Sequence, residues 1–134
     1  MKYLLVLTLA FLTITSGCDP MRRIRMTNQT GEEASVVWMI KEDSINSSPL
    51  FISSDKVVRF DLDTKTPGRS INMSFGIGTW TPKVLRNFVD DLDTLKISWK
   101  NQEIVLDSEE KIMNYLLPRR AGLGKDKIRI TLKE

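Results

Sequence analysis

The chain has 134 residues, which is a typical length for one domain. Hydrophobic residues make up 41% of it and charged residues 28%, a balance that is typical of globular proteins and excludes a disordered chain. The formal net charge is +3, from 20 basic and 17 acidic residues, and this excess is too small to indicate binding to nucleic acid. The composition predicts a single globular domain whose partners do not include nucleic acid.

Histidine is absent from the sequence and cysteine occurs once, as Cys18. The lack of His removes the commonest general base and the commonest metal ligand. A single Cys allows neither an internal disulfide nor a zinc site made of thiolates. We therefore expect no cofactor and no metal, and a protein that is not an enzyme.

The first residues have the order of features found in a secretory signal peptide. Lys2 gives a short positive start, and the segment 4–14 that follows is apolar. This segment is shorter than the roughly 20 residues that a membrane-spanning helix needs, and three small residues follow it at 15–17. The pattern predicts that residues 1–17 are a signal peptide that is removed. The alternatives are a buried strand or helix with an incidental cysteine, and ordinary secretion with a free thiol.

Gly17 directly before Cys18, with the small Ser16 ahead of it, resembles the signal of bacterial lipoproteins. In that family the cysteine thiol receives a diacylglyceryl group, the peptide is cut before the cysteine, and the new amine is often acylated. Thr15 departs from the pattern, since the family prefers Leu at this place. The resemblance implies that Cys18 carries acyl chains such as palmitate and anchors the protein to a membrane of the bacterial cell envelope. Asp19 is compatible with different membranes and faces in different bacterial groups.

Residues 18–20 are expected to form the lipidated N-terminus and a short tether, and residues 21–134 the folded domain. Hydrophobic and polar residues alternate with a period of two through most of this domain, which predicts β-strands. The strands are expected at about 23–26, 34–40, 58–62, 71–77, 95–99, 103–106 and 128–132, with a short edge piece at 50–52. Turn residues at 28–31 predict a hairpin between the first two strands, and those at 100–102 predict a second hairpin.

Two short helices are expected between the strands. Thr81 is a good N-cap and Pro82 is favoured at the first helical position, and apolar residues at helical spacing extend to Leu92. The second helix is predicted to start with a capping box from Asp107 and to end before Pro118. About seven strands with one or two short helices predict a β-rich fold, namely a β-sandwich that is immunoglobulin-like or similar. A small α+β fold is the alternative.

Trp80 is the candidate ligand-binding residue, because it lies in the short segment between the strand at 71–77 and the helix after Thr81. Loops at the ends of regular elements often carry binding residues, and an exposed aromatic ring there can stack on a sugar. The alternative is that the ring is a buried plug that fastens the helix to the sheet.

Acidic residues suggest two further kinds of site. Asp90, Asp91 and Asp93 are a candidate cluster for a hard cation, but their spacing lacks the Gly and the distant Glu of the usual calcium loop. A solvated helix end explains this cluster better. Asp61 and Asp63 are a candidate catalytic pair, although the alternation of the strand places Asp61 outward and favours a solvated charge.

A basic patch is predicted in the loop after the second helix, and its members are Arg119, Arg120, Lys125 and Lys127. Such a patch is suited to phosphate-rich lipid head groups or to an acidic partner, and a plain solvated loop is the alternative. Aromatic residues are not interleaved with these cations, which argues against single-stranded nucleic acid as the partner.

The sequence thus predicts a non-catalytic interaction or structural module. Its partners are expected to be the membrane, through the lipid on Cys18, and an envelope protein or a glycan. A ligand-binding lipoprotein that recognises a glycan through Trp80 is one alternative, and a hydrolase that uses carboxylates is another.

Overall fold

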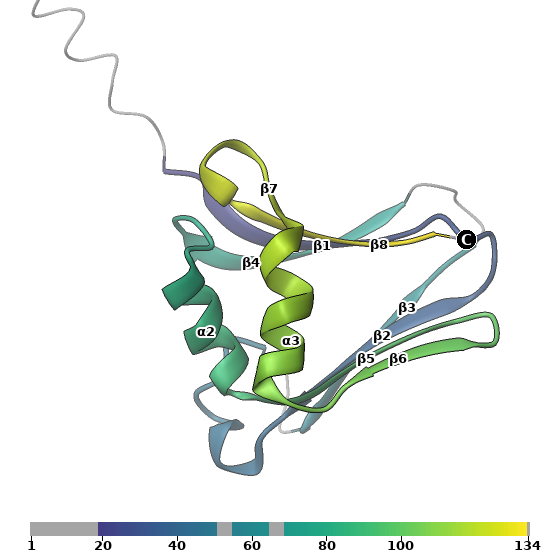
Figure 1. Ribbon diagram of the computed structural model, residues 1–134, viewed down its shortest axis with the longest axis horizontal. Helices are drawn as coiled ribbons and strands as arrows, with labels where there is room; N and C mark the ends of the chain where they lie inside the picture. Colours follow the sequence, from purple (N-terminus) through teal and green to yellow (C-terminus); the bar gives the residue numbers. More distant parts are fainter. Residues whose placement is uncertain (1–18, 51–54, 65–68, 134) are drawn as a thin grey trace, which may run out of the picture.

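Two four-stranded β-sheets form the sides of a wedge (Figure 1). The computed structural model describes residues 19–50, 55–64 and 69–133. Sheet A has the strand order β4-β1-β8-β7, and its strands are β1 (Met21–Asn28), β4 (Ser70–Ile77), β7 (Arg120–Ala121) and β8 (Lys127–Leu132). Sheet B has the order β3-β2-β5-β6, and its strands are β2 (Ala34–Ile40), β3 (Val57–Leu62), β5 (Leu92–Trp99) and β6 (Gln102–Leu106). The prediction of a β-rich fold with two short helices is confirmed.

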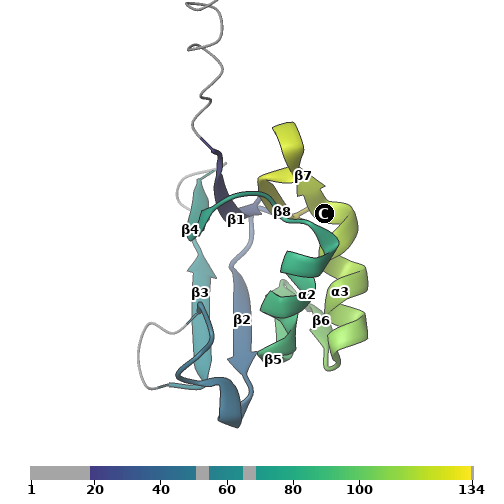
Figure 2. The ribbon, with the colours of Figure 1, turned by 90° about the vertical axis from the view of Figure 1, so that its left-hand side faces the viewer.

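The sheets converge where β1 ends and β2 begins, and they diverge at the opposite end (Figure 1). Helices α2 (Pro82–Asp90) and α3 (Glu109–Leu116) occupy the divergent end. Figure 2 shows the molecule turned by 90°. The edge strands β3 and β4, one from each sheet, lie at the left, and the two helices lie toward the right with β6 and β7. Helices therefore fill the space that two splayed sheets would otherwise leave open. In the described part of the chain, no helix is long and apolar enough to cross a membrane.

The inner faces of the sheets follow the predicted alternation. In sheet A, Ile24 lies beside Ile128, and the next inward pair along these two strands is equally buried. In sheet B, Trp38 lies between Val58 and Leu95 and is fully buried. Among the described residues, the buried hydrophobic core extends from Ile24 to Leu132. Both sheets and both helices contribute to this one core.

The predicted hairpin between the first two strands is wrong. Strand β1 pairs antiparallel with β4 and parallel with β8, whereas β2 pairs with β3 and β5 in the other sheet. The turn at 28–31 carries the chain from one sheet to the other, because both strands bury a face against the shared core. Alternation identifies the buried face of a strand but not its partner. The second predicted hairpin is confirmed, since β5 and β6 pair from Leu95↔Leu106 to Trp99↔Gln102.

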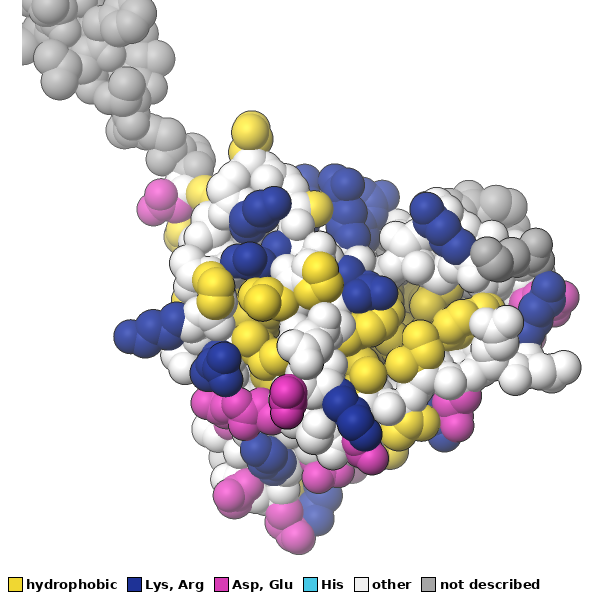
Figure 3. Space-filling view, viewed as in Figure 1, with side chains coloured by type: hydrophobic (Ala, Val, Ile, Leu, Met, Phe, Trp, Pro, Cys, Tyr) yellow, Lys and Arg dark blue, Asp and Glu magenta, His cyan; other side chains and the backbone are white. Residues whose placement is uncertain are grey.

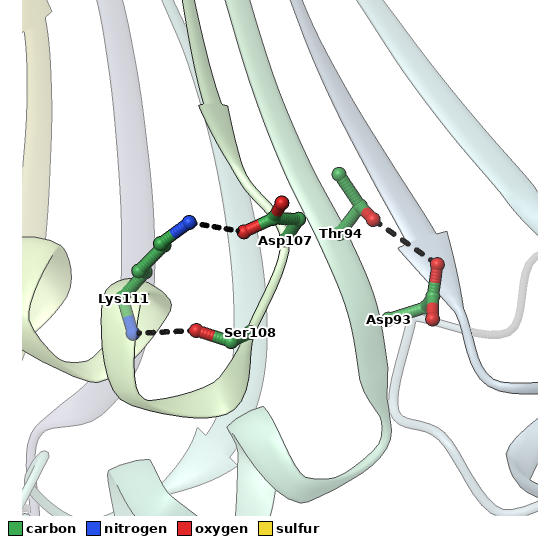
Figure 4. A network of polar contacts seen from close by, with 5 residues as sticks. All are labelled: Asp93, Thr94, Asp107, Ser108 and Lys111. Carbon is green, nitrogen blue, oxygen red and sulfur yellow. Dashed lines mark hydrogen bonds and ion pairs between the residues drawn. The ribbon is translucent and has the colours of Figure 1, made fainter.

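The starts of the helices test the capping predictions. The Thr81 hydroxyl accepts a hydrogen bond from the Val84 amide at 3.2 Å, and Pro82 opens α2, as predicted. The N-cap of α3 is Ser108 rather than Asp107: its hydroxyl accepts from the Lys111 amide at 3.3 Å (Figure 4). Asp107 and Ser108 both lie next to the start of the helix, but the Ser108 hydroxyl is the one that binds the Lys111 amide. The Asp107 carboxylate instead binds the Lys111 ammonium at 2.5 Å.

One helix end differs from the prediction and the other agrees with it. Helix α2 stops at Asp90, and Leu92 already belongs to β5. Helix α3 ends at Leu116, before Pro118 as predicted, and a 3₁₀ turn, Leu117–Arg119, follows it. The loop that follows contains the two-residue strand β7 and a second 3₁₀ turn, Leu123–Lys125. The expected edge piece at 50–52 lies mostly outside the described residues, although Leu50 is buried.

A buried asparagine fastens the narrow end of the wedge. The Asn28 side-chain amide donates to the carbonyl oxygens of Glu32 at 2.6 Å and Leu62 at 3.3 Å. Its carbonyl accepts from the amide and the hydroxyl of Thr30, at 3.0 and 2.7 Å. One side chain therefore joins the end of β1 to the turn after it and to the end of β3 in the opposite sheet. Such a group is expected to be costly to remove, because its buried partners lose their hydrogen bonds together.

We predict that Asn28→Ala lowers the free energy of unfolding by about 2–3 kcal/mol, because several polar groups near the core lose a partner. Urea unfolding followed by circular dichroism measures this change. The neighbouring substitution Gln29→Ala is the control, because the Gln29 side chain is exposed and surface changes usually stay within about 0.5 kcal/mol. Equal effects of the two substitutions would contradict a fastening role for Asn28.

Candidate functional site

Trp80 is buried, with 1% of its surface exposed. Its indole N–H donates to the Arg23 carbonyl at 3.1 Å, and its amide donates to the Lys125 carbonyl at 2.8 Å. The guanidinium of Arg120 donates to the Trp80 carbonyl at 3.0 Å. Trp80 thus joins the loop before α2 to β1 and to the segment before β8. Its burial contradicts an exposed sugar-stacking residue and agrees with the alternative of a plug between helix and sheet.

Trp80 belongs to an aromatic cluster in the divergent end of the wedge. Its ring centroid lies 5.5 Å from those of Phe75 and Phe88, and Phe88 also lies 5.9 Å from Trp38. All these pairs are edge-to-face, the arrangement that aromatic quadrupoles favour. A hollow of about 280 Å³ beside the cluster is lined by Arg22, Pro49, Val84 and Asn87 together with the rings of Phe75, Trp80 and Phe88. The cluster links α2 to both sheets and explains why the loop at Trp80 is part of the core.

The aspartates at the end of α2 do not converge on one point. Asp90 is the last residue of the helix, Asp91 is its C-cap, and Asp93 is exposed on β5. The Asp93 carboxylate accepts from the Thr94 hydroxyl at 3.0 Å (Figure 4). Lys41 donates to the backbone carbonyls of Asp90 and Asp91, at 2.7 and 2.9 Å. Within the described ranges, no group of three or more acidic or cysteine side chains is placed to hold a metal ion.

Asp61 lies outward on β3, as the alternation predicts. Its carboxylate forms an exposed ion pair with the Arg59 guanidinium at 2.8 Å. Both residues line an open depression of about 680 Å³ on the outside of sheet B, where Asp63, Ser35 and Ser98 also contribute. A catalytic pair of carboxylates needs a cleft that separates their protonation states, and an open surface with an adjacent arginine does not provide one. The arrangement favours solvated charge over a hydrolytic site.

Two members of the predicted basic patch have structural roles. The Arg119 guanidinium lies 3.5 Å from the centroid of the Tyr115 ring and donates to the Tyr115 carbonyl at 2.5 Å. Arg120 donates to the Leu117 carbonyl at 3.0 Å as well as to Trp80. These contacts hold the end of α3 in place and leave both arginines half-buried. The patch predicted in this loop is therefore smaller than the sequence indicates.

The larger basic surface is the outer face of sheet A. In the parallel pair β1–β8, Arg23 is beside Lys127 and Arg25 is beside Arg129. The four strands of sheet A contain no Asp or Glu. We call the set Arg23, Arg25, Lys127 and Arg129 the cationic face. Acidic side chains gather in the lower half of Figure 3, over sheet B and the adjoining helix ends, while the part over sheet A shows mainly basic ones.

The outer face of sheet B has a different charge pattern. Its strands carry both signs, and four of their five charges are paired: Arg59 with Asp61 at 2.8 Å, and Lys96 with Glu103 at 2.6 Å. The alternation within β1 and β8 is enough to place Arg23, Arg25 and Arg129 on outward positions. The sequence did not predict the cationic face, because β1 and β8 are about 100 residues apart along the chain. A prediction that the first and last strands pair would have found it.

Known proteins show little similarity to this chain. No family model and no curated protein matches the sequence. A solved structure that resembles the chain is Serratia marcescens Lip, a membrane-bound component of the type VI secretion system. The two are 10% identical, with a TM-score of 0.33 over 85% of this chain and 91% of that one. A likeness this distant carries no argument about the function of this chain.

We predict that Trp80→Ala lowers the free energy of unfolding by about 3–5 kcal/mol, because it leaves a large cavity and removes the hydrogen bond to the Arg23 carbonyl. Trp80→Phe keeps most of the ring and should cost less. Chemical unfolding followed by far-ultraviolet circular dichroism measures both. A loss below about 1 kcal/mol for Trp80→Ala would show that the residue is not part of the core.

Tyr115 gives a prediction at alkaline pH. Burial raises the pKa of its phenol above the usual value, and the neighbouring Arg119 acts in the opposite direction but does not cancel this effect. The folded protein therefore prefers the neutral phenol. The contribution of this preference to the free energy of unfolding is fully present below pH ~10 and is lost as the pH rises through the raised pKa. Between pH 9 and 11, the urea midpoint of Tyr115→Phe should fall less than that of the unchanged protein. An equal fall in both proteins would contradict the raised pKa.

Proposed function

We propose that this protein is a lipid-anchored module of the bacterial cell envelope, which binds other envelope components and catalyses no reaction. The observation that carries the proposal is the order of three features: the apolar segment 4–14, the small residues 15–17 that follow it, and Cys18. Cys18 and the signal peptide lie outside the described residues. The first strand begins at Met21, three residues after this cysteine. Lipid on Cys18 would therefore hold the folded domain close to the membrane.

The energetics of acylation support a stable anchor. Each buried methylene contributes about 0.8 kcal/mol, and one acyl chain alone gives only marginal membrane binding. A diacylglyceryl group supplies two chains on one cysteine, and a third on the new amine would strengthen the attachment. The anchor fixes where the domain acts and leaves the choice of partner to its surface.

The described surface supports a binding role over a catalytic one. Asp61 is paired with Arg59, Asp93 is bound to Thr94, and Asp107 is paired with Lys111. Each carboxylate is exposed and engaged by a close neighbour, which is the usual state of solvated surface charge. Trp80, the one aromatic residue that the sequence offered for a sugar, is buried.

We predict that the protein purified from bacterial membranes lacks residues 1–17 and carries the mass of a diacylglyceryl group on Cys18. Cys18→Ala should abolish the added mass and the incorporation of labelled palmitate, because the thiol that forms the thioether is gone. Intact-mass spectrometry after detergent extraction measures both. Thr15→Leu is the control, because it restores the residue that lipoprotein signals prefer and should leave lipidation unchanged or increased. An unmodified N-terminus in the unchanged protein would overturn the proposal.

A further inference from the structure

We propose that the cationic face binds the anionic head groups of the membrane to which the chain is anchored. The face is defined by Arg23 and Arg25 on β1 and by Lys127 and Arg129 on β8. Arg23, Arg25 and Arg129 are exposed, and none of the four side chains forms an ion pair within the described part of the chain. The position of the membrane rests on the proposed function, whereas the binding itself can be measured without the anchor.

The adjacency of these charges is unfavourable for folding. Like charges directly opposite each other on neighbouring strands destabilise a sheet, and here Arg25 is beside Arg129 while Arg23 is beside Lys127. The partners of Arg25 and Arg23 on the other side, in β4, are the uncharged Asn72 and Ser74. A neighbouring carboxylate would relieve the repulsion, as it does on sheet B, yet none lies within these strands. An external anion is the partner that such a face lacks.

A second observation points to a lipid surface rather than to a soluble anion. Large exposed hydrophobic side chains gather at the end of sheet A where β1 begins. Met21 is 43% exposed and lies beside Ile77, which is 66% exposed. Leu123, in the turn between β7 and β8, is 95% exposed. Apolar residues next to a basic surface are typical of proteins that rest in a membrane interface, where the apolar groups enter the boundary and the cations stay at head-group level.

The chain geometry places both features near the anchor. Met21 is three residues from Cys18, and three extended residues span roughly 11 Å at most. The Debye length at physiological salt is about 8 Å, so a tether this short keeps the start of β1 near the region in which anionic lipids attract cations. The tether therefore brings the cationic face and the exposed Met21 and Leu123 to the membrane together.

The experiment uses the chain from residue 19 to 134, which includes every core residue found in the described part of the chain and lacks Cys18. We expect it to sediment with vesicles of phosphatidylcholine that contain about a third phosphatidylglycerol, and not with pure phosphatidylcholine. Binding should weaken steeply as NaCl rises from about 0.05 to 0.5 M, because salt screens the attraction. Absence of binding to the anionic vesicles at low salt would overturn the proposal and leave an acidic protein as the partner of this face.

Substitutions localise the binding surface. The combined change of Arg23, Arg25 and Arg129 to Gln should lower vesicle partition roughly 100-fold, since each basic residue near an anionic membrane contributes about fivefold. The control changes Arg59, Lys83 and Arg86 to Gln, which removes the same charge from sheet B and α2. Circular dichroism verifies that both variants fold. Equal losses in the two variants would show a general charge effect and contradict a specific face.

The apolar contribution has its own matched pair. Leu123→Ser should reduce partition roughly tenfold, because an apolar side chain no longer enters the interface. Val105→Ser is the control, since Val105 is an exposed hydrophobic residue on β6, in the other sheet. Loss of binding in Val105→Ser but not in Leu123→Ser would place the membrane at sheet B and refute the proposed orientation. Failure of lipidation at Cys18 would leave these results unaffected, so the two proposals can fail separately.

Discussion

The parallel pairing of β1 with β8 determines much of the rest of the structure. It places Ile24 beside Ile128 and puts the first and last strands of the domain next to each other at the centre of sheet A. Side chains alternate along a strand, so burial of these residues on the inner face fixes which residues lie outside. The register that packs the core therefore also aligns Arg25 with Arg129. The burial of the apolar side chains therefore also produces the charged outer surface. A shift of the register by one residue would change both the core and the cationic face.

The two ends of the wedge are held by different chemistry. At the narrow end the sheets approach closely, and the short polar side chain of Asn28 can reach from β1 to the Leu62 carbonyl at the end of β3. At the divergent end the gap is wider, and large rings and two helices fill it. Trp80 fills space there and also forms a hydrogen bond, because its ring packs on Phe88 while its N–H donates to the Arg23 carbonyl. The splay between the sheets thus accounts for a hydrogen-bonded corner at one end and an aromatic cluster at the other.

Local signals in the sequence predicted local structure well. The Thr81-Pro82 start of α2, the β5–β6 hairpin and the inward face of each strand depend on residues close together in the chain. Contacts between distant segments were missed. The sequence does not reveal that the chain passes from sheet A to sheet B between β1 and β2, or that the Lys125 carbonyl and the Arg120 guanidinium bind the backbone of Trp80. The same limit applied to the site, because a basic patch was expected from neighbours in one loop. The cationic face needs strands from opposite ends of the domain.

An orientation with sheet A on the membrane has a consequence for sheet B. The two sheets are opposite sides of the wedge, so the outer face of sheet B would point away from the lipid (Figure 1). Most charges on its strands are neutralised in pairs, such as Lys96 with Glu103, so an anionic surface would attract it far less than the cationic face. The open polar depression between Ser35, Asp61 and Ser98 lies on this side. Division of the charges between the sheets therefore separates a surface suited to lipid from one that stays accessible to a soluble or envelope partner.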